Sequence, residues 1–83
     1  MKLFYFAWVR QKIGRGEDEM ELPAGVATIG ELMSSLRARG GGYAEAFAEP
    51  QRLRAARNQD HVQFDARISD DDEVAFFPPV TGG

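Results

Sequence analysis

Two short segments at opposite ends of the chain constrain the fold more than any other feature. Residues 2–9 (KLFYFAWV) and 73–77 (EVAFF) are rich in the aromatic and β-branched residues that favour strands. Read as strands, both are apolar on both faces, which is typical of strands covered on both sides. We therefore expect the first and last strands to be neighbours at the centre of one sheet.

The strongest helix signal lies between these two strands. Apolar residues recur at i, i+3, i+4 and i+7 from Ile29 to Leu36 and form one stripe. Thr28, followed three residues later by Glu31, has the pattern of a capping box. We predict a helix that begins after Thr28 and ends at the glycine run 40–42, which we interpret as a C-terminal cap.

The remaining elements are shorter. The order of strands and helix predicts an α+β domain of the β-grasp type over residues 1–77, in which one main helix covers one face of a mixed sheet. A flexible tail is expected over residues 78–83. We further expect a loop over 10–17, an edge strand over 18–22, a helical turn over 43–49, and strands over 53–58 and 61–64 joined as a hairpin at Gln59-Asp60.

A single helix leaves the second face of the sheet uncovered, so some aromatic side chains should lie at the surface. An exposed aromatic patch usually marks a protein partner. The candidates are about half of the set Phe4, Phe6, Trp8, Phe76 and Phe77. We predict that Phe6, Trp8, Phe76 and Phe77 contact a partner.

The composition excludes several function classes. The chain has 83 residues and a net charge of -3, which gives no basic surplus for binding nucleic acid and little room for a deep active site. It has no cysteine and one histidine, which excludes disulfides, thiolate or histidine-cage metal sites and a cysteine nucleophile. No apolar run approaches ~18 residues, so no membrane span is expected. Without a signal-peptide pattern, the expected location is the cytoplasm.

Three local motifs suggest chemistry but favour structural interpretations. The glycine run 40–42 follows the predicted helix, so it is not a phosphate-binding loop. His61 and Asp60 are adjacent on a predicted strand and point to opposite faces, which favours a surface histidine over a general-base pair. The acidic run 70–73 lacks the spaced oxygen ligands of a calcium loop, so it reads as a solvated turn or a contact for a basic partner.

The C-terminus, FFPPVTGG, carries the clearest functional signal. The two prolines stiffen the chain into an extended form, and the six residues 78–83 can span up to ~20 Å. The final two glycines make the slimmest peptide tip, able to enter a narrow tunnel. The only reactive group is the terminal carboxylate, which becomes an electrophile if another enzyme activates it, most simply as an acyl-adenylate. The alternative is a frayed end without function.

These residues resemble the small subunits of molybdopterin synthase, the ubiquitin-like sulfur carriers of molybdenum-cofactor biosynthesis. The resemblance covers the opening strand, the helix start, the Ala-x-Asn strand and the whole ending. Two positions depart from the family pattern: Asp71 stands at a usual glycine, where aspartate tolerates left-handed backbone, and Arg57 at a usually apolar position. The matching segments are Leu3–Ala7 with Val9-Arg10, Thr28–Leu32, Ala55–Gln59 and Asp72–Gly83.

The resemblance implies a cycle and a set of partners. An adenylating enzyme related to the ubiquitin activators joins AMP to Gly83, and a sulfur donor converts the adenylate to a thiocarboxylate. The tail, Pro78, Pro79, Val80, Thr81 and Gly82, then inserts into the large synthase subunit, where the sulfur is passed to the cyclic pyranopterin monophosphate precursor. The family implies a heterotetramer of two small and two large subunits. The carrier binds no permanent cofactor or metal, and the catalytic residues lie on the large subunit.

Two alternatives stay open. The same carrier chemistry could serve thiamine or cysteine synthesis or tRNA thiolation, whose carriers share the final glycine pair. A ubiquitin-like modifier or binding module would instead form isopeptide bonds to lysines. Lys2 and Lys12 are the only lysines of the chain, so chains of this protein on itself are not expected.

Overall fold

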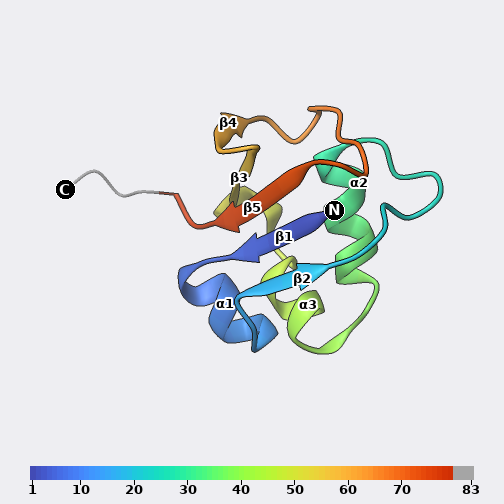
Figure 1. The fold of residues 1–83 in the computed structure, drawn as a ribbon. Helices are drawn as coiled ribbons and strands as arrows, with labels where there is room; N and C mark the ends of the chain where they lie inside the picture. The colour runs from blue at the N-terminus through green and yellow to red at the C-terminus, as the bar shows by residue number, and fades with distance from the viewer. Residues whose placement is uncertain (80–83) are drawn as a thin grey trace.

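In the computed structural model, which describes residues 1–79, five strands form one mixed sheet (Figure 1). The order β2-β1-β5-β3-β4 places the first and last strands side by side and parallel at the centre, as their two-sided apolar character predicts. The other neighbours pair antiparallel, and β2 is the predicted edge strand. The strands are β1 (Lys2–Tyr5), β2 (Glu17–Glu19), β3 (Arg54–Arg57), β4 (Asp60–Val62) and β5 (Glu73–Phe77).

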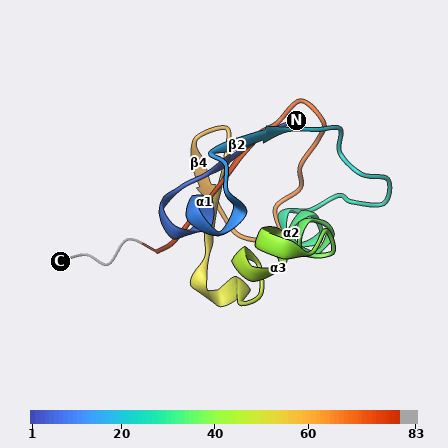
Figure 2. The same cartoon turned by 90° about the horizontal axis from the view of Figure 1, so that it is seen from below.

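The helices gather on one side of this sheet, as Figure 2 shows with the sheet seen nearly edge-on. Within the described residues, no helix covers the opposite face. None of these helices is long and apolar enough to cross a membrane. They are α1 (Ala7–Ile13), α2 (Ile29–Arg37), α3 (Gly41–Ala46) and the 3-10 turn η1 (Pro50–Arg52).

Helix α2 begins as the sequence predicts. The Thr28 hydroxyl accepts a hydrogen bond from the Glu31 backbone N–H at 3.2 Å, and the Glu31 carboxylate accepts one from the Thr28 N–H at 3.1 Å. The backbone N–H of Ala27 and the Thr28 side chain hold the pKa of Glu31 below its usual range. The apolar stripe from Ile29 to Leu36 is buried against the sheet, so the capping box fixes where the covering helix starts.

The first strand is shorter than predicted, and the first half of the expected loop after it is helix. β1 ends at Tyr5, and the chain then turns through Ala7, whose φ of 53° is left-handed, into α1. Val9 reaches the core from this helix instead of from a strand. Gly14, with φ of 90°, caps α1 by donating its N–H to the Arg10 carbonyl at 2.8 Å. Burial of Val9 therefore overrides the strand preference of the aromatic run.

The interpretation of the glycine run as a simple cap of α2 is also wrong. α2 ends at Arg37, and the run instead opens α3 after a left-handed residue at Gly40 (φ 79°). A Cβ on Gly42 would collide with the backbone carbonyl oxygen of Lys12. Helices α1 and α3 thus pack so closely that only glycine fits at this position.

The hairpin turn lies one residue earlier than predicted. Arg57 pairs with Asp60, so the two-residue loop is Asn58-Gln59. Both loop residues have positive φ, 51° and 73°, which is the backbone of the tight turns that suit strand twist.

Alternation along β5 decides which phenylalanine is inside. Val74 and Phe76 are fully buried with Leu3 and Tyr5, and Phe76 packs edge-to-face on Phe47 with ring centroids 5.0 Å apart. The prediction that Phe76 contacts a partner is therefore wrong, because its ring belongs to the core. Phe77 points to the other side.

Candidate functional site

The sheet face opposite the helices carries an apolar hollow, which we call the open face. Phe4 lies beside Ala75, Ala75 beside Ala56, and Ala56 beside His61, so one side chain from each of four strands meets there. The His61 and Phe77 rings lie 5.1 Å apart and are tilted. The hollow has a volume of about 350 Å³ and is lined by Phe4, Phe6, Ala56, Gln59, His61, Glu73, Ala75 and Phe77.

Two predicted partner-contact residues, Phe6 and Phe77, line this open face. Phe6 is 52% exposed, the one large hydrophobic side chain classed as exposed in the described part of the chain. Their contact with a partner stays a prediction. Sequence analysis missed Ala75 and His61 as members of the site, because only the register between β5, β3 and β4 brings them together.

The prediction that Trp8 is part of the first strand is wrong, because Trp8 belongs to α1. Its half-buried indole is covered by the Arg52 guanidinium, 4.9 Å from the ring centroid. A cation over an aromatic face at this distance is attractive. The pair joins α1 to η1, and a partner contact by Trp8 stays a prediction.

The C-terminal tail starts at the edge of the open face. β5 ends at Phe77, whose strand neighbour is Arg54, and Pro78 and Pro79 follow outside the sheet. Proline cannot donate to a ladder, so the strand has to stop here. The remaining predicted tail residues, Val80, Thr81, Gly82 and Gly83, lie outside the described residues.

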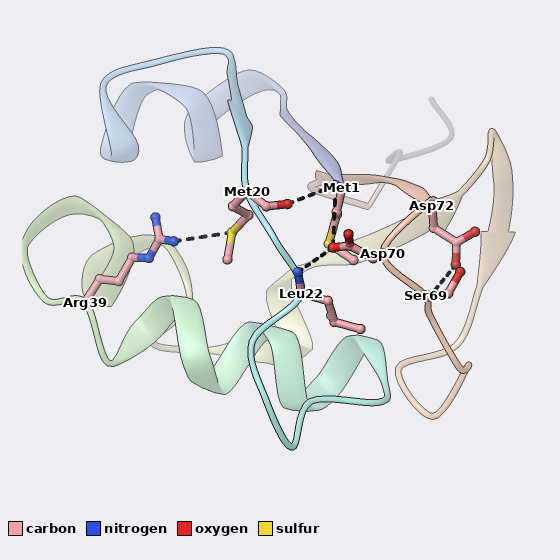
Figure 3. A network of polar contacts seen from close by, with 7 residues as sticks. All are labelled: Met1, Met20, Leu22, Arg39, Ser69, Asp70 and Asp72. Atoms are coloured by element: carbon pink, nitrogen blue, oxygen red, sulfur yellow. Dashed lines mark hydrogen bonds and ion pairs between the residues drawn. The ribbon is translucent and has the colours of Figure 1, made fainter.

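The acidic turn is used mainly to hold the fold (Figure 3). The Asp70 carboxylate accepts the Leu22 N–H at 2.6 Å and so fastens the segment after β2. Asp72 accepts the Asn58 side-chain amide at 2.9 Å and the Ser69 N–H at 2.8 Å. The Asn58 amide and then the Ser69 N–H hold the pKa of the Asp72 carboxyl below its usual range.

Asp71, which is exposed like its neighbour Asp70, does not have a positive φ. The non-glycine residues of the described chain with positive φ are Ala7, Asn58 and Gln59, so Asp71 does not need the left-handed conformation that its glycine position suggested. Arg57, the other departure, is half-buried and donates to the Arg67 carbonyl at 2.6 Å. Across residues 1–79 no three acidic or histidine side chains gather as a metal site.

A second polar group, the Asp18 cluster, lies on the helix side of the sheet. Asp18 accepts the hydroxyls of Tyr5 and Tyr43 at 2.9 and 2.6 Å and the Arg15 guanidinium at 2.8 Å. Burial acts to raise the pKa of Asp18, but these three donors outweigh it and lower the pKa. Burial and the Asp18 hydrogen bond raise the pKa of Tyr5 and of Tyr43. The cluster ties β1, β2 and α3 together on the side of the sheet opposite the open face.

The family of the chain follows from a match along nearly its whole length. The sequence pattern of the ThiS family matches residues 3–83. The chain belongs to the ThiS family. ThiS-family membership agrees with the resemblance seen in the strand, helix and tail motifs.

Two relatives cover this ThiS-family chain from end to end. It is 43% identical over 83 residues to the molybdopterin synthase sulfur carrier subunit of Escherichia coli strain K12, covering 100% of this chain and 99% of the relative. It is 35% identical, with the same coverage, to the molybdopterin synthase sulfur carrier subunit of Haemophilus influenzae.

Solved structures share the fold of this ThiS-family chain. A Pyrococcus furiosus protein assigned as molybdopterin converting factor, subunit 1, has a TM-score of 0.75 at 33% identity, covering 95% of each chain. Small archaeal modifier protein 1 of Haloferax volcanii has a TM-score of 0.68 at 21% identity, covering 96% of this chain and 97% of that one. The second likeness concerns the fold alone, and the two together confirm the predicted β-grasp architecture.

Proposed function

We propose that this chain is the sulfur carrier subunit of a molybdopterin synthase. The observation that carries the proposal is the position of β5: the central strand ends at Phe77 beside the open face and leads directly into Pro78, Pro79 and the diglycine ending. The folded body thus presents the start of the tail at the edge of an apolar surface. The full-length identity to carriers of molybdopterin synthase supports this choice of pathway.

The chemistry takes place at the Gly83 carboxyl. A carboxylate oxygen is a poor leaving group, so an adenylating enzyme transfers AMP from ATP to Gly83 and releases pyrophosphate. A sulfur donor then displaces AMP and leaves a thiocarboxylate, whose sulfur is a better nucleophile than a carboxylate oxygen. The chain has no cysteine, so Gly83 is the position that holds the sulfur.

The partner enzymes supply the remaining groups. The loaded tail, Pro78 to Gly83, inserts into the large subunit, where the sulfur attacks the cyclic pyranopterin monophosphate precursor; two carriers in turn complete the dithiolene. The open face is the docking surface, and two carriers join two large subunits. The acids, bases and phosphate ligands lie on the partners, so this chain is a carrier subunit instead of a complete enzyme. The need for ATP places the cycle in the cytoplasm.

The first experiment measures the intact mass of the chain after incubation with the adenylating enzyme, ATP and a sulfur source. Exchange of one oxygen for sulfur raises the mass by about 16 Da. Deletion of Gly83 should abolish loading, because the acceptor carboxyl retreats by one residue, ~3.3 Å. An unchanged mass with partners that load a known carrier contradicts the proposal.

The pathway is tested separately from the chemistry. Restoration of a molybdoenzyme activity in a strain that lacks its own carrier supports molybdopterin synthesis. Rescue of a thiamine or tRNA-thiolation defect would instead assign the carrier to one of those pathways, with the same carrier chemistry. A ladder of isopeptide conjugates on a denaturing gel would instead favour a protein modifier. One structural neighbour, small archaeal modifier protein 1, is named as a modifier.

A further inference from the structure

Arg54 is an exposed cation at the root of the tail without an acidic partner in the described part of the chain. It is the strand neighbour of Phe77, the last residue of β5, so it lies at the edge of the open face. Its guanidinium donates through Nη1 to two backbone carbonyls, those of Leu53 at 2.8 Å and Gln51 at 3.4 Å. No ion pair of Arg54 forms within residues 1–79.

Arg15 and Arg52 differ from Arg54 in this respect, whereas Arg37 on α2 also forms no ion pair within residues 1–79, so position at the tail root is what distinguishes Arg54. Arg15 pairs with Asp18 at 2.8 Å, and Arg52 lies over Trp8 and 3.9 Å from Glu49. Arg54 instead lines a second hollow, of about 460 Å³, that begins where the open face ends at His61. This hollow is lined by Leu53, Arg54, His61, Val62, Gln63 and Phe64.

Docking of an apolar surface on the open face would remove water from this guanidinium. A charge that loses water without gaining a counter-charge is strongly unfavourable, whereas a well-placed carboxylate offsets the loss and fixes the register of the interface. The opposite edge of the same sheet carries exposed Glu17 and Glu19 on β2. Arg54 is a cation at the tail root, and a carboxylate placed against it would favour one orientation of a partner.

We propose that the protein docking on the open face places a carboxylate side chain in the hollow beside Arg54, and that this ion pair determines which partner binds and in which orientation. The inference rests on the proposed function and names the chemistry of the surface that the large subunit presents. An arginine fork recognises a carboxylate through paired hydrogen bonds.

The test measures the affinity of the full chain for its large subunit by titration calorimetry. Loss of one member of a buried charge pair weakens binding by about 30-fold or more. Arg54→Leu should therefore bind at least that much more weakly, although leucine makes the edge of the open face more apolar. Arg54→Glu should bind more weakly still. Arg37→Glu makes the same charge change as Arg54→Glu at an exposed position of α2. It is the matched control and should stay within about threefold, as expected for a charge outside the interface.

A charge swap completes the test. Reversing one carboxylate of the partner's docking surface to arginine should restore binding to Arg54→Glu and to no other variant. Thermal melting of each variant verifies that the fold is intact. If Arg54→Leu binds as tightly as the unaltered chain, or if Arg37→Glu is equally weakened, the inference is wrong while the proposed function stands. If the unaltered chain itself does not bind the large subunit, the proposed function fails and the inference with it.

Discussion

Phe76 and Phe77 are adjacent in sequence but lie on opposite faces of β5, so replacing each by alanine should separate folding from docking. Phe76 is fully buried and packs edge-to-face on Phe47 at 5.0 Å. Removing a buried phenylalanine ring costs about 3–5 kcal/mol of unfolding free energy. A chain of this length has only ~4–12 kcal/mol in total. Phe76→Ala should therefore lose a large share of its stability.

In a domain of this size, 1 kcal/mol shifts the melting temperature by roughly 4–8 °C. Phe76→Ala should then melt at least ~12 °C below the unaltered chain. Phe77 is half-buried and meets His61 on the open face. Phe77→Ala should lower the melting temperature by less than ~8 °C, because its ring fills no closed cavity.

The assays are thermal and urea unfolding followed by the fluorescence of Trp8, the one tryptophan of the chain, and calorimetric titration with the large subunit. Phe77→Ala should bind the large subunit about 30-fold more weakly, as expected of an aromatic at the centre of an interface. If Phe76→Ala melts like the unaltered chain, or if Phe77→Ala is the less stable of the two, the assignment of faces on β5 is wrong.

Three further changes probe the body of the molecule. Folding lowers the pKa of Asp18, so the stability that its carboxylate contributes is present at neutral pH and is lost as the pH falls below about 5 through the folded-state pKa. Asp18→Asn should therefore cost about 1.5–3 kcal/mol of unfolding free energy at pH 7. Urea titrations from pH 7 to 3 should show this difference shrink, and a constant difference would contradict the sign. Thr28→Ala removes the capping box and should cost about 1 kcal/mol in urea unfolding, with exposed Ser34→Ala on α2 as the control that changes little. Gly42→Ala meets the Lys12 carbonyl and should lower the melting temperature more than Gly30→Ala, whose added Cβ is 3.4 Å from the nearest atom; the reverse order would refute the tight α1–α3 packing.

The elements that sequence analysis predicted well are those with local signals. The two-sided apolar strands at the chain ends are indeed central neighbours, and Thr28 with Glu31 marks the start of α2. Helix α1 was missed because seven residues are too few for a clear helical period, and its Trp8-Val9 pair has the composition of a strand. Gly14, one residue after the helix, was the available signal.

Which residues line the open face depends on packing and strand register, and a single sequence shows neither. Both Phe76 and Phe77 are apolar aromatics, so alternation alone leaves two assignments, and only packing against Phe47 chooses between them. The meeting of Arg54 with Phe77 and of His61 with Ala56 depends on strand register, which is set by long-range packing. The chemistry proposed for the tail depends on no strand register, because it rests on the FFPPVTGG ending and on the family resemblance.

The pairing of β1 with β5 has a consequence for the order of events in biosynthesis. The parallel neighbour of β1 is β5, which lies between β1 and β3 in the sheet. Because β5 is residues 73–77, β1 lacks this neighbour until those residues have left the ribosome. Such distant pairing makes the closing of the sheet a late step. A nascent chain that stops before residue 73 lacks the strand that joins the two halves of the sheet. A chain that has completed its sheet has therefore already synthesised β5, the strand from which the tail departs.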